Sequence, residues 1–174
     1  TNSNVGRALQ EIGKMDKGVA SYHKDLAIKP DCAEVHNNLG LALARLGKLE
    51  HAFSSYQTAF AVNPDYALAH SNLGSALLEL GRFDEAVASY KKSLAIKPDF
   101  AEAHSNLGLA LQELGKLDKA VASYHKALAI KPDYAEVHNN LGLALAHLGK
   151  LEHSFSSYQR ALAVKPDYAR AHSN

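Results

Sequence analysis

Asparagine recurs every 34 residues along this chain, and the sequence around it recurs with the same period. The row consists of Asn4, Asn38, Asn72, Asn106, Asn140 and Asn174. A fixed period of roughly 20 to 50 residues is typical of repeat proteins, in which one unit is too small to bury its apolar face alone and stacks on its neighbours. The period therefore restricts the chain to an array of stacked units.

The repeat accounts for the whole sequence, with no linker and no second domain between copies. Each unit ends with Pro-Asp-Tyr or a close variant, and cutting after this motif gives complete copies flanked by partial ones. We predict one array over residues 1–174, made of a partial repeat 1–32, the repeats 33–66, 67–100, 101–134 and 135–168, and a stub 169–174.

Charge and hydropathy narrow the classes of partner and compartment. Lys and Arg number 19 against 18 acidic residues, and the two signs alternate, which removes the electrostatic basis for binding nucleic acid or an anionic membrane. No apolar run approaches the roughly 20 residues that span a bilayer. The one cysteine, Cys32, cannot form an internal disulfide, so we predict a soluble protein of the cytoplasm or another reducing intracellular compartment.

Apolar residues recur at helical spacing in two blocks within each copy, which predicts two amphipathic helices per repeat. In the copy 101–134 the blocks are Leu107, Ala110, Leu111 and Leu114, then Ala120, Val121, Tyr124, Ala127 and Leu128. The expected fold class is all-α, a superhelical solenoid of antiparallel helix pairs.

Glycine and proline mark the predicted ends of these helices. A glycine between the two blocks can take the left-handed conformation that ends a helix, and a proline stops the second helix. The turn glycines are Gly13, Gly47, Gly81, Gly115 and Gly149, and the prolines are Pro30, Pro64, Pro98, Pro132 and Pro166.

A second row of glycines lies inside the first helix of each repeat, where glycine costs about 1 kcal/mol relative to alanine. The row is Gly6, Gly40, Gly74, Gly108 and Gly142. We expect close helix contact to offset this cost, with Ala52, Ala86 and Ala120 of the second helices as the contacting residues.

The combined pattern of Leu-Gly, Ala, Tyr, Ala and Pro resembles the tetratricopeptide repeat over the whole chain. In one copy it is Leu107, Gly108, Ala120, Tyr124, Ala127 and Pro132. Where that family often has tryptophan, this chain has His36, His70, His104, His138 and His172. The resemblance implies a right-handed superhelix with the first helix of each pair along its concave side.

Residues around the asparagines on the exposed face of the first helix form the predicted binding surface. An asparagine amide can pair with the carbonyl and the amide of an extended backbone without recognising side chains. The predicted peptide-binding residues are the six asparagines with Leu41, Ser75, Leu109 and Leu143. The same surface is expected to include Ser3, Asn37, Ser71, Ser105 and Asn139, which directly precede asparagines of the row.

An alternative role for the asparagines is to bond to their own scaffold, since duplication copies a structural residue as readily as a functional one. The motifs His-Ser-Asn-Leu-Gly and His-Asn-Asn-Leu-Gly favour the ligand role, because they resemble the repeat array of O-linked N-acetylglucosamine transferases. That resemblance implies that the concave asparagines grip an extended polypeptide substrate.

The carboxylate clamp, another peptide-binding mode of tetratricopeptide arrays, adds lysines on the same helices to hold acidic tails. Here the corresponding positions hold Ser or Asn and mostly acidic residues such as Glu34, Glu102 and Glu136, so the clamp is incomplete. Acidic residues at the groove edge favour neutral or mildly basic peptides instead.

The sequence contains no evident catalytic or metal-binding constellation. Five of its ten histidines form the row from His36 to His172, and stacked helices about 8–10 Å apart would keep them from sharing one metal ion. Cys32 has no predicted base beside it, and the tyrosines of the second helices are expected in the core. We predict no enzymatic activity, no cofactor and no metal.

These features favour a non-catalytic module that binds extended polypeptide. Two alternatives stay open: the substrate-recognition part of a peptide O-glycosyltransferase with its catalytic domain elsewhere, and a self-assembling structural scaffold. The helix expected to cover Phe155, Tyr158 and Leu162 stops at Asn174. We therefore also expect a longer parent array and head-to-tail self-association through uncapped ends.

Overall fold

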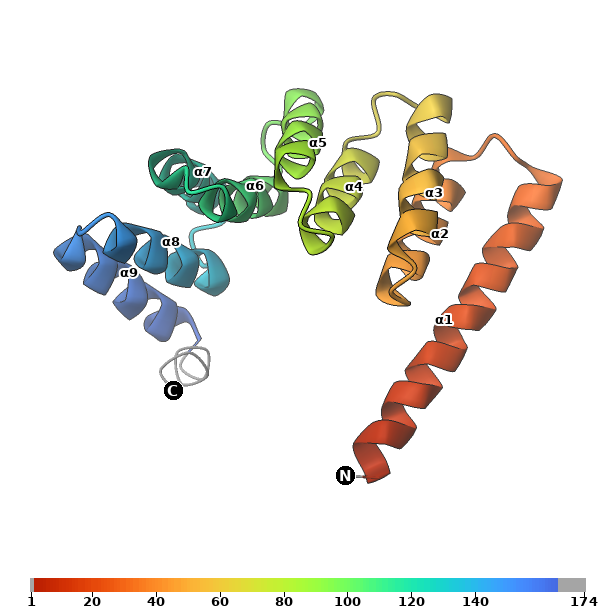
Figure 1. The fold of residues 1–174 in the computed structure, drawn as a ribbon, viewed down its shortest axis with the longest axis horizontal. Helices are drawn as coiled ribbons and strands as arrows, with labels where there is room; N and C mark the ends of the chain where they lie inside the picture. The colour runs from red at the N-terminus through yellow and green to blue at the C-terminus, as the bar shows by residue number, and fades with distance from the viewer. Residues whose placement is uncertain (1, 166–174) are drawn as a thin grey trace.

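The computed structural model describes the backbone of residues 2–165 and the side chains of residues 11–165, and over this range the chain is built of helices (Figure 1). Their bounds are α1 Asn2–Ile28, α2 Ala33–Arg45, α3 Leu49–Val62, α4 Ala67–Glu79, α5 Phe83–Ile96, α6 Ala101–Glu113, α7 Leu117–Ile130, α8 Ala135–His147 and α9 Leu151–Val164. None of these helices has the combination of length and apolar character needed to cross a membrane. Asn174 and the side chain of Asn4 lie outside the described residues.

Four helix pairs, α2–α3, α4–α5, α6–α7 and α8–α9, turn at the predicted glycines. Gly47, Gly81, Gly115 and Gly149 have φ of 75°, 74°, 70° and 74°, the left-handed conformation that glycine adopts at little cost. At Gly115 the turn closes with Lys116 N donating to the Leu111 carbonyl and Gly115 N to the Gln112 carbonyl, at 2.8 and 2.9 Å. This pairing satisfies carbonyls at the end of α6 and confirms the predicted turn at these four positions.

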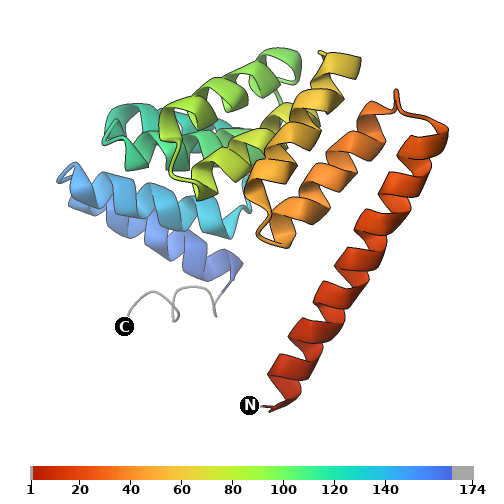
Figure 2. The ribbon, with the colours of Figure 1, turned by 45° about the vertical axis from the view of Figure 1, so that its right-hand side comes forward.

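The predicted turn at Gly13 is wrong. The helix α1 continues through Gly13 as one element from Asn2 to Ile28, and Gly13 is not among the glycines with positive φ. Figures 1 and 2 show α1 as a single long helix at one end of the array. The first repeat therefore lacks the helix pair that its sequence predicts.

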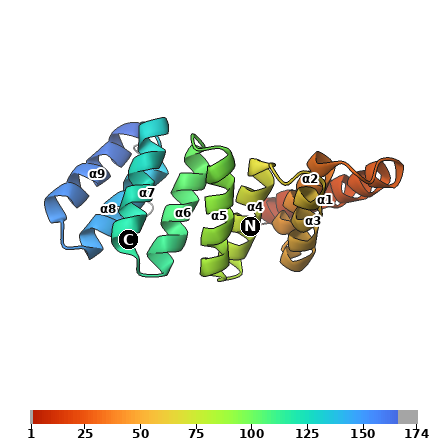
Figure 3. The same ribbon diagram turned by 90° about the horizontal axis from the view of Figure 1, so that it is seen from above.

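The helix pairs stack in chain order into an arc, with α1 at one end and α9 at the other (Figures 1 and 3). Successive first helices contact one another, α2 with α4, α4 with α6 and α6 with α8. The second helices reach the next repeat through its first helix, α3 to α4, α5 to α6 and α7 to α8. First helices therefore converge on the concave side, and second helices lie on the outer side.

Tyrosine rings hold each pair together. Tyr56, Tyr90 and Tyr124 are almost completely buried in one continuous core. A Cβ on Gly40, Gly74, Gly108 or Gly142 would lie 2.5 to 2.8 Å from the Cε1 atom of the tyrosine in its own pair. The close approach predicted for these glycines is confirmed, but its partner is a tyrosine ring and not the expected alanine row. The ring needs the space that a methyl group would fill.

Candidate peptide-binding groove

The concave surface is formed by α2, α4, α6 and α8, which carry four of the six predicted asparagines. Asn38, Asn72, Asn106 and Asn140 are all half-buried, as are Leu41, Ser75 and Leu109 three residues after an asparagine. Leu143 on α8 is 38% exposed. Since residues three apart share a helix face, these side chains form one surface along successive repeats, which we call the asparagine groove.

Three of the residues that directly precede the asparagines, Asn37, Ser71 and Ser105, do not belong to this surface as predicted, and the side chain of Ser3 lies outside the described residues. Asn37, Ser71 and Ser105 are buried, with exposed fractions of 1%, 4% and 1%, and Asn139 is half-buried. One residue along a helix turns the side-chain direction by about 100°, which takes these side chains from the groove into the contact between repeats. The asparagine groove is therefore narrower than the sequence suggests.

Asn72 and Asn38 bond to the scaffold through Asn37, and Asn106 bonds to Tyr90. The side chain of Asn72 donates from Nδ2 to Oδ1 of Asn37, 2.9 Å away in the preceding repeat, and Asn37 donates to Oδ1 of Asn38 at 3.3 Å. This chain of amides links α2 to α4. An amide has two N–H groups and an oxygen with two lone pairs, so these bonds use only part of the capacity of Asn72 and Asn38.

Tyrosine hydroxyls lie beneath the groove, a feature that the sequence reasoning missed because it treated these residues as core alone. The Tyr90 hydroxyl lies 3.0 Å from the Ser75 hydroxyl, and the Tyr124 hydroxyl donates to Oε1 of Gln112 at 2.9 Å. Burial raises the pKa of Tyr90 to about 12, although hydrogen bonds with Ser75 and Asn106 oppose the rise. The two polar partners stand at different spacings, 15 residues before Tyr90 and 12 residues before Tyr124, so no single period in the sequence indicates them.

Acidic side chains set the electrostatic character of the groove. Burial raises the pKa of Tyr124, and the negative charges of Glu113 and Glu136 raise it further. Burial followed by the charge of Glu79 acts in the same direction on the pKa of Tyr56. The charge of Arg45 opposes the rise in the pKa of Tyr56, so the negative field is clearest at Tyr124, where Glu113 on α6 and Glu136 on α8 act together.

Four histidines of the row have a structural role, and His172 lies outside the described residues. Nε2 of His36, His70, His104 and His138 lies 2.8 to 3.0 Å from the carbonyl oxygen of the proline that ends the preceding repeat. Because a carbonyl only accepts, Nε2 must carry the proton, and each ring ties the repeat boundary to the next first helix. Within residues 11–165 no cluster of three or more His, Cys, Asp or Glu is placed to hold a metal ion.

Comparison with known proteins agrees with this architecture, a solenoid of helix pairs with an open concave face. Family models described as TPR repeat match residues 42–81, 74–115 and 113–149, and models described as tetratricopeptide repeat match residues 6–59 and 135–168. The chain belongs to the tetratricopeptide repeat family. A search of curated proteins gives no match to the sequence.

Several solved structures share the fold. A crystal structure of MamA has a TM-score of 0.82 at 25% identity, and the alignment covers 95% of this chain and 97% of that one. TTC0263, a thermophilic TPR protein from Thermus thermophilus, has a TM-score of 0.75 at 25% identity, with 97% and 93% covered. YrrB, a TPR protein with an unusual peptide-binding site, has a TM-score of 0.76 at 19% identity, with 98% and 88% covered, a level of identity that shows the fold alone.

Proposed function

We propose that this chain is a non-catalytic interaction module that binds an extended polypeptide in the asparagine groove. The observation that carries the proposal is the placement of Asn38, Asn72, Asn106 and Asn140, which lie half-buried at one equivalent position on the first helices of four successive repeats. Asn4 and Asn174 continue the row in sequence at either end. The tetratricopeptide fold, which YrrB shares and combines with an unusual peptide-binding site, supports the same class of partner.

The spacing of the groove suits an extended chain. Packed helices lie about 8–10 Å apart, and an extended strand advances about 3.3 Å per residue. One asparagine would then meet the peptide backbone at about every third residue. Each net hydrogen bond contributes only about 1 kcal/mol, so affinity should rise with peptide length and should draw on apolar contact with Leu41, Leu109 and Leu143.

The negative field of Glu113 and Glu136 at Tyr124 gives the groove a charge preference. A neutral or mildly basic peptide meets this field without repulsion, whereas an acidic peptide does not. We expect basic variants of one unstructured peptide to bind more tightly than acidic variants at low salt, and the difference to shrink as salt is added.

A triple variant tests the proposal. Fluorescence anisotropy of labelled unstructured peptides is compared for the unaltered chain and for Asn72→Ala, Asn106→Ala and Asn140→Ala combined, with folding checked by circular dichroism. We expect at least a tenfold loss of affinity. Gln57→Ala with Gln159→Ala, which removes exposed amides from the outer helices, is the matched control and should bind normally. Unchanged binding by the folded triple variant would assign the asparagines to the scaffold.

A second proposal is head-to-tail self-association. The last described helix, α9, exposes Leu151 at 68% and Phe155 at 63%. Phe53, at the position equivalent to Phe155, contacts Arg82 of the following repeat, so this surface lies at the end of the array. Light scattering over a dilution series, repeated with Phe155→Ser, tests it: a mass that rises with concentration only while Phe155 is present supports assembly.

A cytoplasmic location and a role within a larger glycosyltransferase both remain predictions of the sequence.

A further inference from the structure

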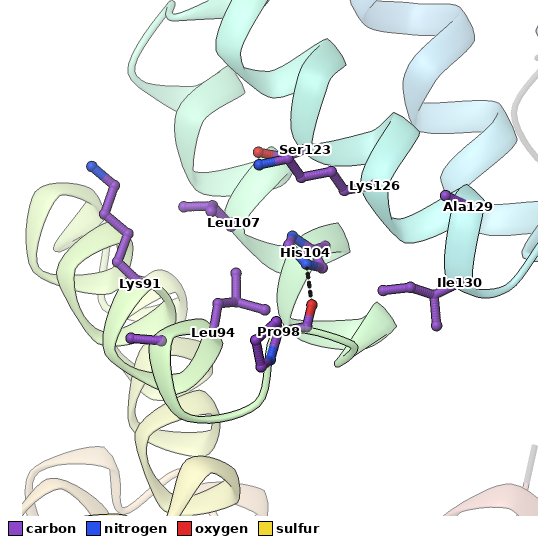
Figure 4. Close-up of a pocket in the computed structure, with 10 residues that line it drawn as sticks. Lys91, Leu94, Pro98, His104, Leu107, Ser123, Lys126, Ala129 and Ile130 are labelled. Atoms are coloured by element: carbon purple, nitrogen blue, oxygen red, sulfur yellow. Dashed lines mark hydrogen bonds between the residues drawn. The ribbon is translucent and has the colours of Figure 1, made fainter.

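A cleft of about 620 Å³ opens between α5 and α7, with α6 as its floor (Figure 4). Leu94 and Lys91 line it from α5, His104 and Leu107 from α6, and Ser123 and Lys126 from α7. None of these residues belongs to the asparagine groove. The second helices form its walls, which places the cleft on the outer side of the array.

The same cleft recurs one repeat later. A hollow of about 480 Å³ between α7 and α9 is lined at the six equivalent positions by His125, Leu128, His138, Leu141, Ser157 and Arg160. Both floors therefore present a histidine ring held by the carbonyl of the preceding proline, at 2.8 Å from Pro98 in one and 2.8 Å from Pro132 in the other. Recurrence of the ring, the leucines, the serine and a cation makes this a repeated feature of the fold.

The third equivalent place, between α3 and α5, shows what such a cleft accommodates. Phe60 stands there at the position of Leu94 and Leu128, and its ring stacks on His70 with centroids 4.5 Å apart and planes 5° from parallel. His70 is held by Pro64 at 3.0 Å as the other histidines are held by their prolines. The chain therefore supplies its own aromatic ring over one histidine, while leucine at the other two places leaves open volume.

The charged residues that line the two clefts determine which sequence neighbours a bound aromatic residue should have. The ionised side chains lining the first cleft are Lys91 and Lys126, and those lining the second are Lys150 and Arg160. A carboxylate beside either cleft would gain attraction without meeting a like charge in the lining. This preference is opposite in sign to that of the asparagine groove.

We propose that the clefts over His104 and His138 are docking sites for a second polypeptide, each receiving a phenylalanine or tyrosine side chain whose neighbours in sequence are acidic. The ring stacks on the histidine as Phe60 stacks on His70, and the leucines enclose its edges. The acidic neighbours pair with Lys91, Lys126 and Arg160 at the rim. The outer face can then hold one partner while the groove holds another.

The probe is a fluorescein-labelled peptide, Glu-Asp-Phe-Asp-Glu, titrated into the full chain, with Glu-Asp-Ala-Asp-Glu as its control. Leu94→Phe combined with Leu128→Phe should fill both clefts in the way that Phe60 fills the third, and should weaken binding at least tenfold. Phe60→Leu should open the third cleft and raise the stoichiometry from two to three. The asparagine triple variant should bind this probe as tightly as the unaltered chain.

Two further measurements test the ring stacking and the charge pairing separately. Ring stacking should shift the carbon-bound proton signals of His104 and His138 upfield in proton NMR spectra. Lys126→Glu with Arg160→Glu, both exposed, should weaken binding without altering the fold. Equal binding of the Phe and Ala peptides, equal binding by the leucine-to-phenylalanine variant, or no binding at millimolar peptide would overturn the proposal.

Discussion

The first repeat and the repeat formed by α6 and α7 share one sequence period but differ in structure. Gly115 ends α6 in the left-handed conformation, with φ of 70°, and α7 folds back against α6. Gly13 occupies the equivalent position, yet α1 passes through it without a turn. A glycine thus permits a helix to end but does not require it, and the packing beyond the turn decides between the two outcomes.

The difference in packing is visible at one position of the second helix. Ala59, Ser93, Ala127 and Ala161 are fully or almost fully buried there, and the Ser93 hydroxyl donates to the Ala67 carbonyl of the partner helix at 2.8 Å. The first repeat has Asp25 at this place, and Asp25 is exposed. Folding α1 into a pair would bury an unpaired carboxylate, which is costly. The continuous helix keeps that charge in water.

The largest expected contrast concerns the tyrosines. Tyr124→Ala removes a completely buried ring and should lower the free energy of unfolding by about 3–5 kcal/mol, as for other buried aromatic residues. Tyr22→Ala removes a half-buried ring from α1 and should cost about 1 kcal/mol. Urea midpoints followed by circular dichroism measure both. Equal losses would mean that the first repeat closes into a pair in solution.

The next contrast uses the glycines inside the helices. In Gly108→Ala the new methyl group would stand 2.5 Å from Cε1 of Tyr124, and overpacking of this kind should destabilise the array by about 1–3 kcal/mol. Gly18→Ala meets nothing within 4 Å and should stabilise α1 by up to about 1 kcal/mol through helix propensity. Thermal melting of the two variants should therefore shift in opposite directions.

The turn glycines give a smaller contrast in stability, in which the same substitution destabilises one repeat and stabilises the other. Gly115→Ala forces a side chain into positive φ and should cost about 1–2 kcal/mol. Gly13→Ala replaces a glycine within a continuous helix and should gain about 1 kcal/mol. Chemical denaturation of both variants checks the signs. Destabilisation by Gly13→Ala would show that residue 13 turns as residue 115 does.

The smallest effect on stability is expected for Asp25→Ala, which should change the free energy of unfolding by less than about 0.5 kcal/mol because the side chain is exposed. Its informative readout is a distance. Spin labels at Arg7→Cys and Lys24→Cys, in a Cys32→Ser background, should lie about 26 Å apart along a straight helix. Removing the carboxylate should add a population with a shorter distance, and Asp25→Asn, which keeps the polar group, should add less.

Much of the fold and part of the candidate site could be predicted from residue spacing. The turns at Gly47, Gly81, Gly115 and Gly149 were predicted because local backbone conformation depends on local sequence. The predicted groove included residues that are buried in the structure, such as Asn37 and Ser105. Helix spacing shows which residues share a face, but it does not show how the helix is rotated against its neighbours. The outer clefts were not predicted at all, because they form between second helices of different repeats.

The sequence by itself determined the class of this protein, since a 34-residue period with two helical blocks allows only a stack of helix pairs. Only the tertiary structure decided that α1 stays straight, that Phe60 covers His70 and that Leu94 leaves room beside His104. The period repeats local preferences from copy to copy. Burial of a charge or the filling of a cleft depends instead on side chains that meet across repeats, so a single residue such as Asp25 or Phe60 changes the outcome without changing the period.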